Sequence, residues 1–533
     1  MFWADYFTDQ IIKSGKYKPY WVDDMKTPSG KIHVGSLRGV VIHDLLYKVL
    51  REKGKPATYT YCINDMDPMD GFPVYLDRDK FYKYMGYPLV KIPSPIPGFK
   101  SFAEYYAQEF IGVFNKIGCR PQIVWDSKLY EAGKFDKLIK IFLDHTEKIR
   151  DIFRGHYKSF KNQNYFPYQP ICPKCGKIST TKIYKWDGEF VYFRCLKDAV
   201  DYTQGCGYEG KLKPEKTNGK LPWKIEWSCH WQTLGVTIEW SGKDHMTKGG
   251  SWEFADRISR EILSYPTPQA QGYEHFLIGG RKMSSSKGRG ASAFEMAQNL
   301  PPQLLRFLMV RINFKTAINF DPAGNTIPNL FDEYDSYAQE FYKAGAKTDH
   351  GRIWQLSQIG KIPVKKLFYP RFRDVANYIQ TPSVDTQRKF EEIKGSKLTK
   401  EEKEILEERK KYTRIWLAKY ASEEAKFEVK PLEINVSTGV SACAVISAIQ
   451  ISLDEQQKKY LSALIDLINQ KDWKPEDLQY QMYELTKKIK IPAKKAFQAV
   501  YQSLLGKSYG PKAAWLILKD KEKILKNLKE VVK

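Results

Sequence analysis

The order of extended and helical runs near the amino terminus constrains the fold of this chain more than any other feature. Residues 18–23 predict a short strand, and a loop with the sequence TPSG occupies residues 27–30. Residues 34–50 then carry apolar side chains at helical spacing, and residues 57–63 predict a second strand. A strand, a glycine-containing turn, a helix and a strand in this order are typical of the start of a parallel α/β sheet.

The remainder of the chain changes character twice. Residues 102–116 predict a helix and residues 121–125 a strand, whereas residues 160–220 are rich in aromatic residues, glycine and cysteine. Beyond about residue 290 the pattern is mostly helical, and the charge-dense stretch 394–414 predicts a solvated helix. The expected division is the first half of an α/β domain (1–160), an insert (161–220), the second half (221–290), a connecting segment (291–345) and a helical region (346–533).

Charge and cysteine content limit the class of protein. The chain of 533 residues has 86 lysines and arginines against 62 aspartates and glutamates, a net charge of +24. This excess favours a polyanionic partner, a nucleic acid or an anionic membrane surface, although a lysine-rich genome is an alternative explanation. No apolar run reaches the roughly 18 residues of a membrane span, and residues 1–5 do not begin a signal peptide. Eight cysteines are too few for a disulfide framework, so we expect a cytoplasmic protein.

The loop between the first predicted strand and helix has the features of a phosphate site. Its sequence over residues 27–36 is TPSGKIHVGS. A helix that begins there presents free backbone N–H groups to an anion, and Gly35 allows a nucleotide to approach the backbone. His33 is placed to donate a hydrogen bond to a phosphoryl oxygen. The alternative is that His33 has only a structural role at the start of a helix.

A second loop, residues 280–288 with the sequence GRKMSSSKG, is basic and rich in small residues. Two lysine ammonium groups at this spacing neutralise a triphosphate, and serine hydroxyls donate hydrogen bonds to its oxygens. A flexible basic loop without a ligand is the alternative interpretation.

Together the two loops resemble the paired signature of class I aminoacyl-tRNA synthetases. His33 and Ser36 match the first signature, and residues 282–286 match the second. Ser285 stands where the second signature usually has lysine, and Lys287 is a candidate for the missing charge. The resemblance implies three catalytic residues, His33, Lys282 and Lys287. It implies the following ATP-binding residues: Pro28, Gly30, His33, Gly35, Ser36, Gly242, Asp244, Lys282, Met283, Ser284 and Ser286.

A longer series of motifs resembles the class I lysyl-tRNA synthetases. It consists of FWAD at 2–5, TPSG at 27–30, CPKCG at 172–176, WKIEW at 223–227, SGKDH at 241–245 with GGS at 249–251, KMSSSKG at 282–288 and FDEYD at 331–335. It covers residues 1 to about 340 and implies a Rossmann-like parallel sheet with an inserted metal site, followed by an all-α region. Three residues depart from the family pattern: Met25 replaces glycine, Ser36 replaces asparagine and His230 replaces arginine.

The resemblance implies a pocket for lysine. A four-carbon stem needs apolar or aromatic walls, and the substrate ammonium needs an acidic partner. The residues implied to line it are Thr27, Trp223, His245 and Tyr273. Three carboxylates remain open as the partner of the ammonium: Asp23, Asp24 and Glu274.

The implied reaction is ATP-dependent formation of lysyl-adenylate, with Mg²⁺ bridging the phosphates, and transfer of the lysyl group to the terminal adenosine of tRNA(Lys). A class I synthetase for arginine or glutamate is the nearest alternative. A catalytically silent RNA-binding relative and a small nucleotidyltransferase are further alternatives, and the long helical carboxyl-terminal region disfavours the latter.

Four of the eight cysteines cluster in the insert region: Cys172, Cys175, Cys195 and Cys206. Four thiolates suit a tetrahedral structural Zn²⁺ site, and the CPKCG sequence favours a tight turn around a metal. The second pair has ten intervening residues where two are usual, and buried free cysteines are the alternative. We expect core positions for the other cysteines: Cys62, Cys119, Cys229 and Cys443.

Overall fold

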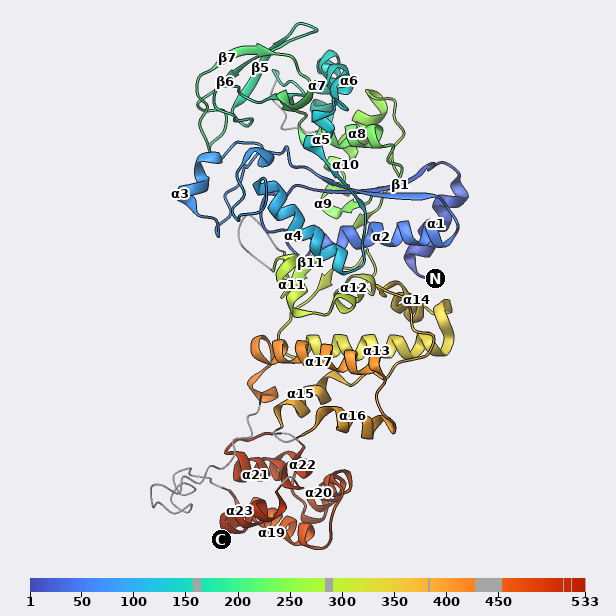
Figure 1. Ribbon diagram of the computed structural model, residues 1–533, viewed down its shortest axis with the longest axis vertical. Helices are drawn as coiled ribbons and strands as arrows, with labels where there is room; N and C mark the ends of the chain where they lie inside the picture. Colours follow the sequence, from blue (N-terminus) through green and yellow to red (C-terminus); the bar gives the residue numbers. More distant parts are fainter. Residues whose placement is uncertain are drawn as a thin grey trace. The chain divides into compact units, whose positions relative to one another are not determined.

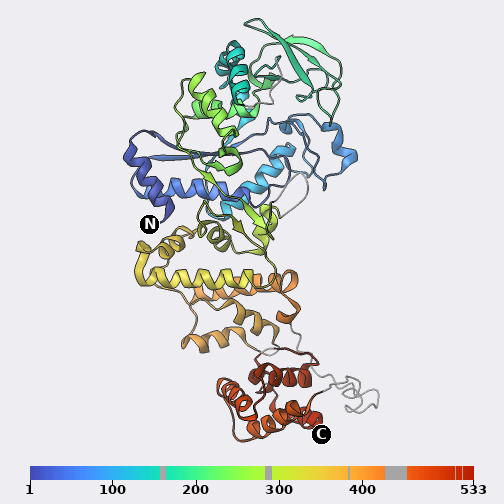
Figure 2. The same cartoon turned by 180° about the vertical axis from the view of Figure 1, so that it is seen from behind.

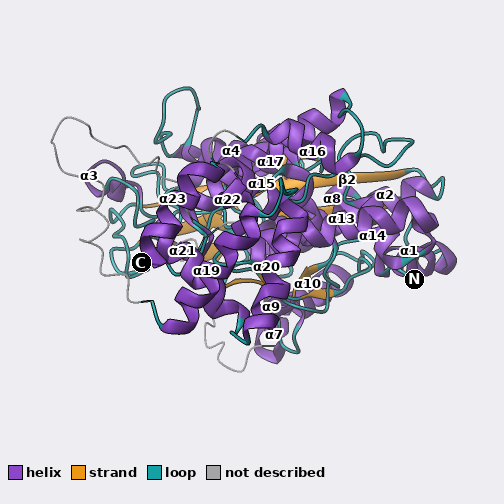
Figure 3. Ribbon diagram, turned by 90° about the horizontal axis from the view of Figure 1, so that it is seen from below, coloured by secondary structure: helices purple, strands orange, loops and turns teal. Residues whose placement is uncertain are grey.

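The chain forms two compact units. The computed structural model describes residues 1–156, 164–282, 291–381, 384–426, 453–510, 512–518 and 520–532. The first unit comprises Met1–Asp321 and Leu330–Lys366, and the second comprises Pro322–Asn329 and Leu367–Lys533. Helices account for more of the described chain than strands do (Figure 3).

A parallel sheet is the centre of the first unit. Its strands, in the order β1-β2-β3, are β1 (Tyr20–Lys26), β2 (Ala57–Ile63) and β3 (Gln122–Trp125). On the other side of β1 the chain near Ile238 adds a parallel bridge to Val22, and Ile238 is bridged in turn to Gln269. The backbone N–H of Asp23 donates to the carbonyl of Ile238 at 3.1 Å. The predicted parallel α/β fold class is therefore confirmed.

Helices cover both faces of this sheet (Figures 1 and 2). On one face lie α2 (Ser36–Glu52) and α4 (Phe102–Lys116), and on the other lies α8 (Trp223–Leu234). The hydroxyl of Tyr59 on β2 donates to the carbonyl of Val40 on α2 at 3.1 Å. Because successive side chains of a strand point to opposite faces, β1 directs residues alternately towards α2 and α8.

An antiparallel insert interrupts the first unit. It contains β4 (Gln169–Pro170), β5 (Thr181–Trp186), β6 (Val191–Cys195), β7 (Glu209–Leu212) and β8 (Gly219–Lys220). Strands β5, β6 and β7 form a three-stranded antiparallel sheet in that order. Strands β4 and β8 pair with each other, so the two ends of the insert meet.

The first unit also contains the following shorter helices and strands, which lie wholly within it. Its other helices are α1 (Trp3–Ser14), α3 (Arg78–Phe81), α5 (Asp126–Glu131), α6 (Asp136–Asp144), α7 (Thr146–His156), α9 (Lys243–Met246), α10 (Ser251–Glu261), α11 (Ala293–Asn299), α12 (Pro302–Val310) and α14 (Asp349–Leu356). Its other strands are β9 (Ser241–Gly242), β10 (Gly272–Tyr273), β11 (Phe276–Ile278), β12 (Arg281–Lys282) and β13 (Ile318–Asn319).

The second unit is helical in its described residues. Helix α13 (Thr326–Ala344) begins in its first segment and continues into the first unit. The helices that follow are α15 (Phe372–Gln380), α16 (Thr386–Lys394), α17 (Lys400–Lys419), α19 (Glu455–Asn469), α20 (Pro475–Ile489), α21 (Ala493–Leu505), α22 (Ala513–Leu518) and α23 (Lys521–Val532). Among all described residues, none of the helices is both long enough and apolar enough to cross a membrane.

The charge-dense stretch 394–414 is not one solvated helix. Helix α16 ends at Gly395, which adopts φ +76°, and α17 begins after Thr399 with a capping box that Glu402 completes. The gap exists because a left-handed residue ends a helix and a threonine–glutamate box starts one. Leu406 and Tyr412 on α17 are buried, so this helix contributes to the core of its unit.

Candidate active site

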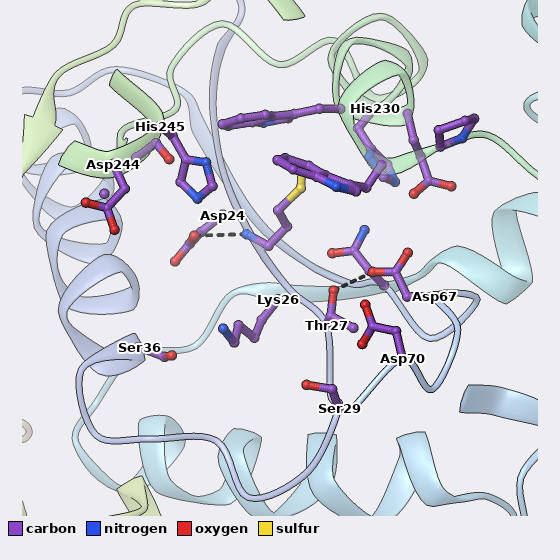
Figure 4. A pocket seen from close by; sticks show the side chains of 18 of the residues that line it. Asp24, Lys26, Thr27, Ser29, Ser36, Asp67, Asp70, His230, Asp244 and His245 are labelled. Carbon is purple, nitrogen blue, oxygen red and sulfur yellow. Dashed lines mark hydrogen bonds between the residues drawn. The ribbon is translucent and has the colours of Figure 1, made fainter. Parts of the chain in front are cut away.

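A cavity of about 800 Å³ opens at the carboxyl ends of β1 and β2 in the first unit (Figure 4). Its walls come from the loops after these strands, from the start of α8, and from residues 239–245 and 273–276. Ligands of parallel α/β sheets bind at this edge because the strand ends and the helix N-termini converge there. The position and size of the cavity suit a nucleotide together with a small second substrate.

The first predicted loop borders this cavity. His33, Gly35 and Ser36 line it, whereas Pro28 and Gly30, which we expected to bind ATP, do not. Gly30 has φ +146°, and a Cβ there would lie 2.4 Å from the hydroxyl of Tyr75. Gly30 therefore shapes the loop, because only glycine adopts this conformation beside Tyr75 without strain.

The backbone on either side of the second predicted loop lies close to the first loop or to the cavity. Before it, β12 pairs antiparallel with β11, and Phe276 of β11 lines the cavity. After it, the N–H of Val34 donates to the carbonyl of Ala291 at 3.1 Å, and His33 pairs with Ser292 through an antiparallel bridge. The side chain of Lys282 and all of Met283, Ser284, Ser286 and Lys287 lie outside the described residues.

All four residues expected to surround lysine line the cavity: Thr27, Trp223, His245 and Tyr273. The imidazole of His245 packs edge-on against Trp223, with ring centroids 5.9 Å apart, and against Trp227 at 5.5 Å. Gly242 and Asp244 line the same cavity, and Asp244 contacts Nε2 of His275 at 3.1 Å. The structure thus brings together residues from strands and helices far apart in the sequence.

The three carboxylates left open by the sequence differ in their surroundings. Asp23 is fully buried, does not line the cavity and accepts a hydrogen bond from the hydroxyl of Thr60. Glu274 lines the cavity but forms an ion pair of 2.6 Å with Lys243. Asp24 lines the cavity, is 13% exposed, and accepts a hydrogen bond from the N–H of Met25 at 2.9 Å.

Lys26, which the sequence analysis did not single out, also lines the cavity (Figure 4). It follows Asp24 by two residues on β1, so both side chains lie on the α2 face of the sheet. Burial lowers the pKa of Lys26, although the nearby Asp24 carboxylate opposes this shift. The sequence feature that could have identified Lys26 was its position at the end of a strand, immediately before the TPSG loop.

A buried charged network that the sequence did not reveal supports Thr27. The hydroxyl of Thr27 donates to Asp67, and the ammonium of Lys220 contacts both Asp67 and Glu226, the latter at 2.8 Å. Burial raises the pKa of Glu226 to about 7, although the charge of Lys220 lowers it. Strand β8 of the insert is thereby joined to the loop after β2 and to α8, because Lys220, Asp67 and Glu226 lie on these three segments.

A second buried pair explains one departure from the family pattern. Nε2 of His230, which stands where the family usually has arginine, contacts Asp126 at 2.7 Å, and Asn64 donates to the same carboxylate at 2.8 Å. Burial lowers the pKa of His230, but the charge of Asp126 and this hydrogen bond raise it further, to about 9. His230 therefore pairs with the buried carboxylate of Asp126 at this position.

Glu239 is a buried carboxylate at the wall of the cavity. It accepts hydrogen bonds from the indole N–H groups of Trp227 at 2.8 Å and Trp231 at 2.6 Å. Burial raises the pKa of Glu239 to about 7, although the two indole hydrogen bonds lower it. Glu239 fixes the two indole rings, one of which packs against His245.

The four clustered cysteines of the insert converge on one point. Their sulfur atoms all lie within 4.8 Å of one another, with Cys172 and Cys206 at 3.6 Å and Cys175 and Cys195 at 3.7 Å. Sulfurs bound tetrahedrally to one Zn²⁺ at about 2.3 Å are about 3.8 Å apart, so the donor set fits this metal.

The unusual spacing of the second cysteine pair is accommodated by a closed loop. The N–H of Gly205 donates to the carbonyl of Leu196 at 3.0 Å, and the N–H of Gly207 to that of Cys195 at 2.9 Å. The residues between Cys195 and Cys206 therefore form a loop whose two ends are hydrogen-bonded to each other, which brings the two cysteines together. Cys62, Cys119 and Cys229 are buried as expected, and Cys443 lies outside the described residues.

A parallel sheet, a histidine loop at its carboxyl edge and a returning hairpin beside that loop together define a class I aminoacyl-tRNA synthetase. The family model described as tRNA synthetases class I (K) matches residues 1–360. The chain belongs to this family.

Two lysine–tRNA ligases are similar to this chain along nearly its whole length. A lysine–tRNA ligase of Thermoplasma acidophilum is 29% identical over 537 residues, covering 100% of this chain and 99% of that protein. Lysine–tRNA ligase 1 of Methanosarcina acetivorans is 31% identical over 539 residues, covering 97% and 96%. A solved glutamate–tRNA synthetase of Elizabethkingia anophelis covers 96% of this chain and 99% of its own, with 12% identity and a TM-score of 0.41.

Proposed function

We propose that the chain is a lysine–tRNA ligase that activates lysine in the cavity at the end of β1 and transfers it to the 3′-terminal adenosine of tRNA(Lys). Membership of the class I (K) family supports the reaction. The observation that carries the lysine specificity is the enclosed carboxylate of Asp24, in a cavity whose other walls include Trp223 and Tyr273.

Asp24 binds the side-chain ammonium of lysine in this proposal. The other enclosed carboxylates of the cavity already have strong partners: Lys220 for Asp67 and Glu226, two indoles for Glu239, and Lys243 for Glu274. Asp24 has no lysine or arginine within ion-pair distance among the described residues. A buried carboxylate without a fixed cation gains most from a substrate ammonium, because neither charge is then left unpaired.

ATP occupies the part of the cavity at the start of α2. His33, Gly35 and Ser36 border the α-phosphate at the start of the helix, and Gly242 and Asp244 hold the adenosine. Lys282 and Lys287 of the second loop neutralise the leaving pyrophosphate, assisted by Met283, Ser284 and Ser286. Mg²⁺ would neutralise part of the charge of the phosphates.

The reaction needs positioning more than covalent help from the protein. A carboxylate oxygen of lysine forms a bond to the α-phosphorus while the bond from this phosphorus to the bridging oxygen of pyrophosphate breaks. His33 donates a hydrogen bond to the phosphoryl oxygen on which negative charge increases. The ribose hydroxyl of tRNA then attacks the activated carbonyl, and AMP leaves.

The other parts of the chain serve tRNA and stability. The four-cysteine site binds Zn²⁺ in a structural role, since four thiolates leave no open coordination position. The division at 1–160, 161–220, 221–290, 291–345 and 346–533 assigns catalysis to the two α/β segments and anticodon recognition to the helical region. The net charge of +24 supports binding of a polyanion.

Amino-acid-dependent exchange of pyrophosphate with ATP, measured with tRNA present for all twenty amino acids, tests this function. We expect exchange with lysine, a strong loss of turnover in H33A, and a raised KM for lysine in D24N with the KM for ATP little changed. Exchange with arginine or glutamate and not with lysine would contradict the proposed specificity.

A further inference from the structure

Gly39, the fourth residue of α2, packs against Asp24 and Tyr273, two residues that line the cavity. Glycine destabilises a helix relative to alanine, so its presence here needs another reason. A Cβ built on Gly39 would lie 2.6 Å from the hydroxyl oxygen of Tyr273 and 2.9 Å from Oδ2 of Asp24. Both distances are shorter than non-bonded atoms tolerate, so the two polar groups converge on the space that a side chain would fill.

We infer that Gly39 is a specificity-determining residue, whose missing side chain lets Asp24 and Tyr273 occupy the positions from which they together meet the ammonium of lysine. This inference rests on the proposed lysine–tRNA ligase function and deepens it. The carboxylate supplies the opposite charge, and the hydroxyl oxygen of Tyr273 accepts a further hydrogen bond from an ammonium that has three donors.

A buried histidine lies behind Asp24. His43 on α2 is fully buried, and its Nδ1 lies 2.8 Å from the carbonyl of Gly39 and 3.5 Å from Oδ2 of Asp24. The backbone N–H of Trp240 donates to Nε2 of His43 at 2.8 Å. Because Nε2 accepts this bond, Nδ1 carries a proton. Burial lowers the pKa of His43, but the charge of Asp24 and the hydrogen bond to it raise the pKa further. His43 therefore orients the carboxylate of Asp24.

The strands that carry Tyr273 and Asp24 hold these two side chains against Gly39. Tyr273 lies on β10, which pairs in parallel with β9 at Gly242. Asp24 lies on β1 and accepts the N–H of Met25 through its other oxygen, Oδ1, at 2.9 Å. A methyl group on residue 39 would therefore rotate the carboxylate and the phenol away from their positions, whereas helix α2 itself would accept it.

The decisive experiment compares Gly39→Ala with Gly112→Ala. Gly112 lies within α4 and has no atom within 4 Å of a built Cβ, so it is a matched control for the change in helix propensity. We expect G39A to raise the KM for lysine about tenfold, the effect of weakening one charge-assisted contact, with the KM for ATP within about twofold. In G112A both KM values stay at the wild-type level, and neither variant lowers Tm.

A second variant tests whether G39A acts through the contact with Tyr273 or through a general change in the structure of the site. Tyr273→Phe removes the atom closest to the built Cβ, so it costs less lysine affinity in the G39A background than in the wild type. A wild-type KM for lysine in G39A, together with a raised Tm, would overturn the inference while leaving lysine activation intact. If the wild-type enzyme activates no lysine at all, the proposed function itself fails.

Discussion

Successive residues at the end of β1 point to opposite faces of the sheet. Asp24 and Lys26 face α2, whereas Met25 packs with the tryptophans of α8 (Figure 4). The period-two alternation of a strand thus separates charged from apolar functions within three residues. A shift of one residue in the pairing of β1 with β2 would exchange these functions.

Lys26 gives a prediction about pH. Lys26 lines the cavity together with Ser36 at the start of α2, so we expect its ammonium to bind a phosphate of ATP. K26M should therefore lower kcat/KM for ATP by about one to two orders of magnitude. Because burial lowers the pKa of Lys26, the ammonium is lost at a lower pH than that of an exposed lysine. The wild-type kcat/KM for ATP should therefore fall at alkaline pH, and K26R should extend activity to higher pH. An identical alkaline limb in K26R would rule out this role.

At the scale of single residues, the sequence predicted the aromatic residues that line the cavity. It did not predict which carboxylate is available for the substrate ammonium. Asp23, Asp24 and Glu274 look equivalent in sequence. Asp23 and Asp24 lie on opposite faces of β1, and Glu274 has Lys243 beside it, and tertiary contacts decide both differences. Glu239 was missed for the same reason: its two indole donors become neighbours only after α8 packs on the sheet.

At the scale of elements, the insert is tied to the catalytic sheet by Lys220. This lysine is only 1% exposed and joins β8 to Asp67 after β2 and to Glu226 on α8. Asp67 in turn accepts the hydroxyl proton of Thr27. The pairing of β4 with β8 and this ion network therefore place the insert against the lysine half of the cavity.

Lys220→Met tests this connection. It leaves two buried carboxylates without their cation, which costs about 3–5 kcal/mol of unfolding free energy. We expect a lower midpoint of urea denaturation and a raised KM for lysine, because Thr27 loses its fixed partner. The exposed Lys185 on β5 supplies the control, and K185M should change neither quantity. Equal stability of K220M and K185M would refute the structural role of the network.

Removal of the metal tests the cysteine site. The purified full chain should contain one zinc per molecule by atomic emission spectroscopy, and C175S should lose it. Because the metal joins β6 to the turns on either side, its loss should also lower Tm. C229A changes a buried cysteine outside the cluster and should retain the zinc. A chain without zinc whose Tm a chelator does not alter would contradict the assignment.

The secondary structure of the sheet was predictable to within a few residues. Helix 102–116 and strand 57–63 agree with the structure in both bounds, and strand 18–23 was displaced by two or three residues from β1. Local periodicity determines these elements. The segments near Ile238 and Gln269 could not be predicted, because each joins the sheet by an isolated bridge rather than a regular strand.

At the scale of the whole molecule, the central claim is that one cavity holds ATP and lysine together, between the first loop, α8 and β10. A crystal structure with a non-hydrolysable lysyl-adenylate analogue tests this claim most directly. The account predicts the adenosine beside Gly242 and Asp244, the phosphate mimic at the start of α2 next to His33, and the side-chain ammonium within hydrogen-bond distance of Asp24 and Tyr273. An analogue bound outside this cavity, or with its ammonium on Glu274, would contradict it.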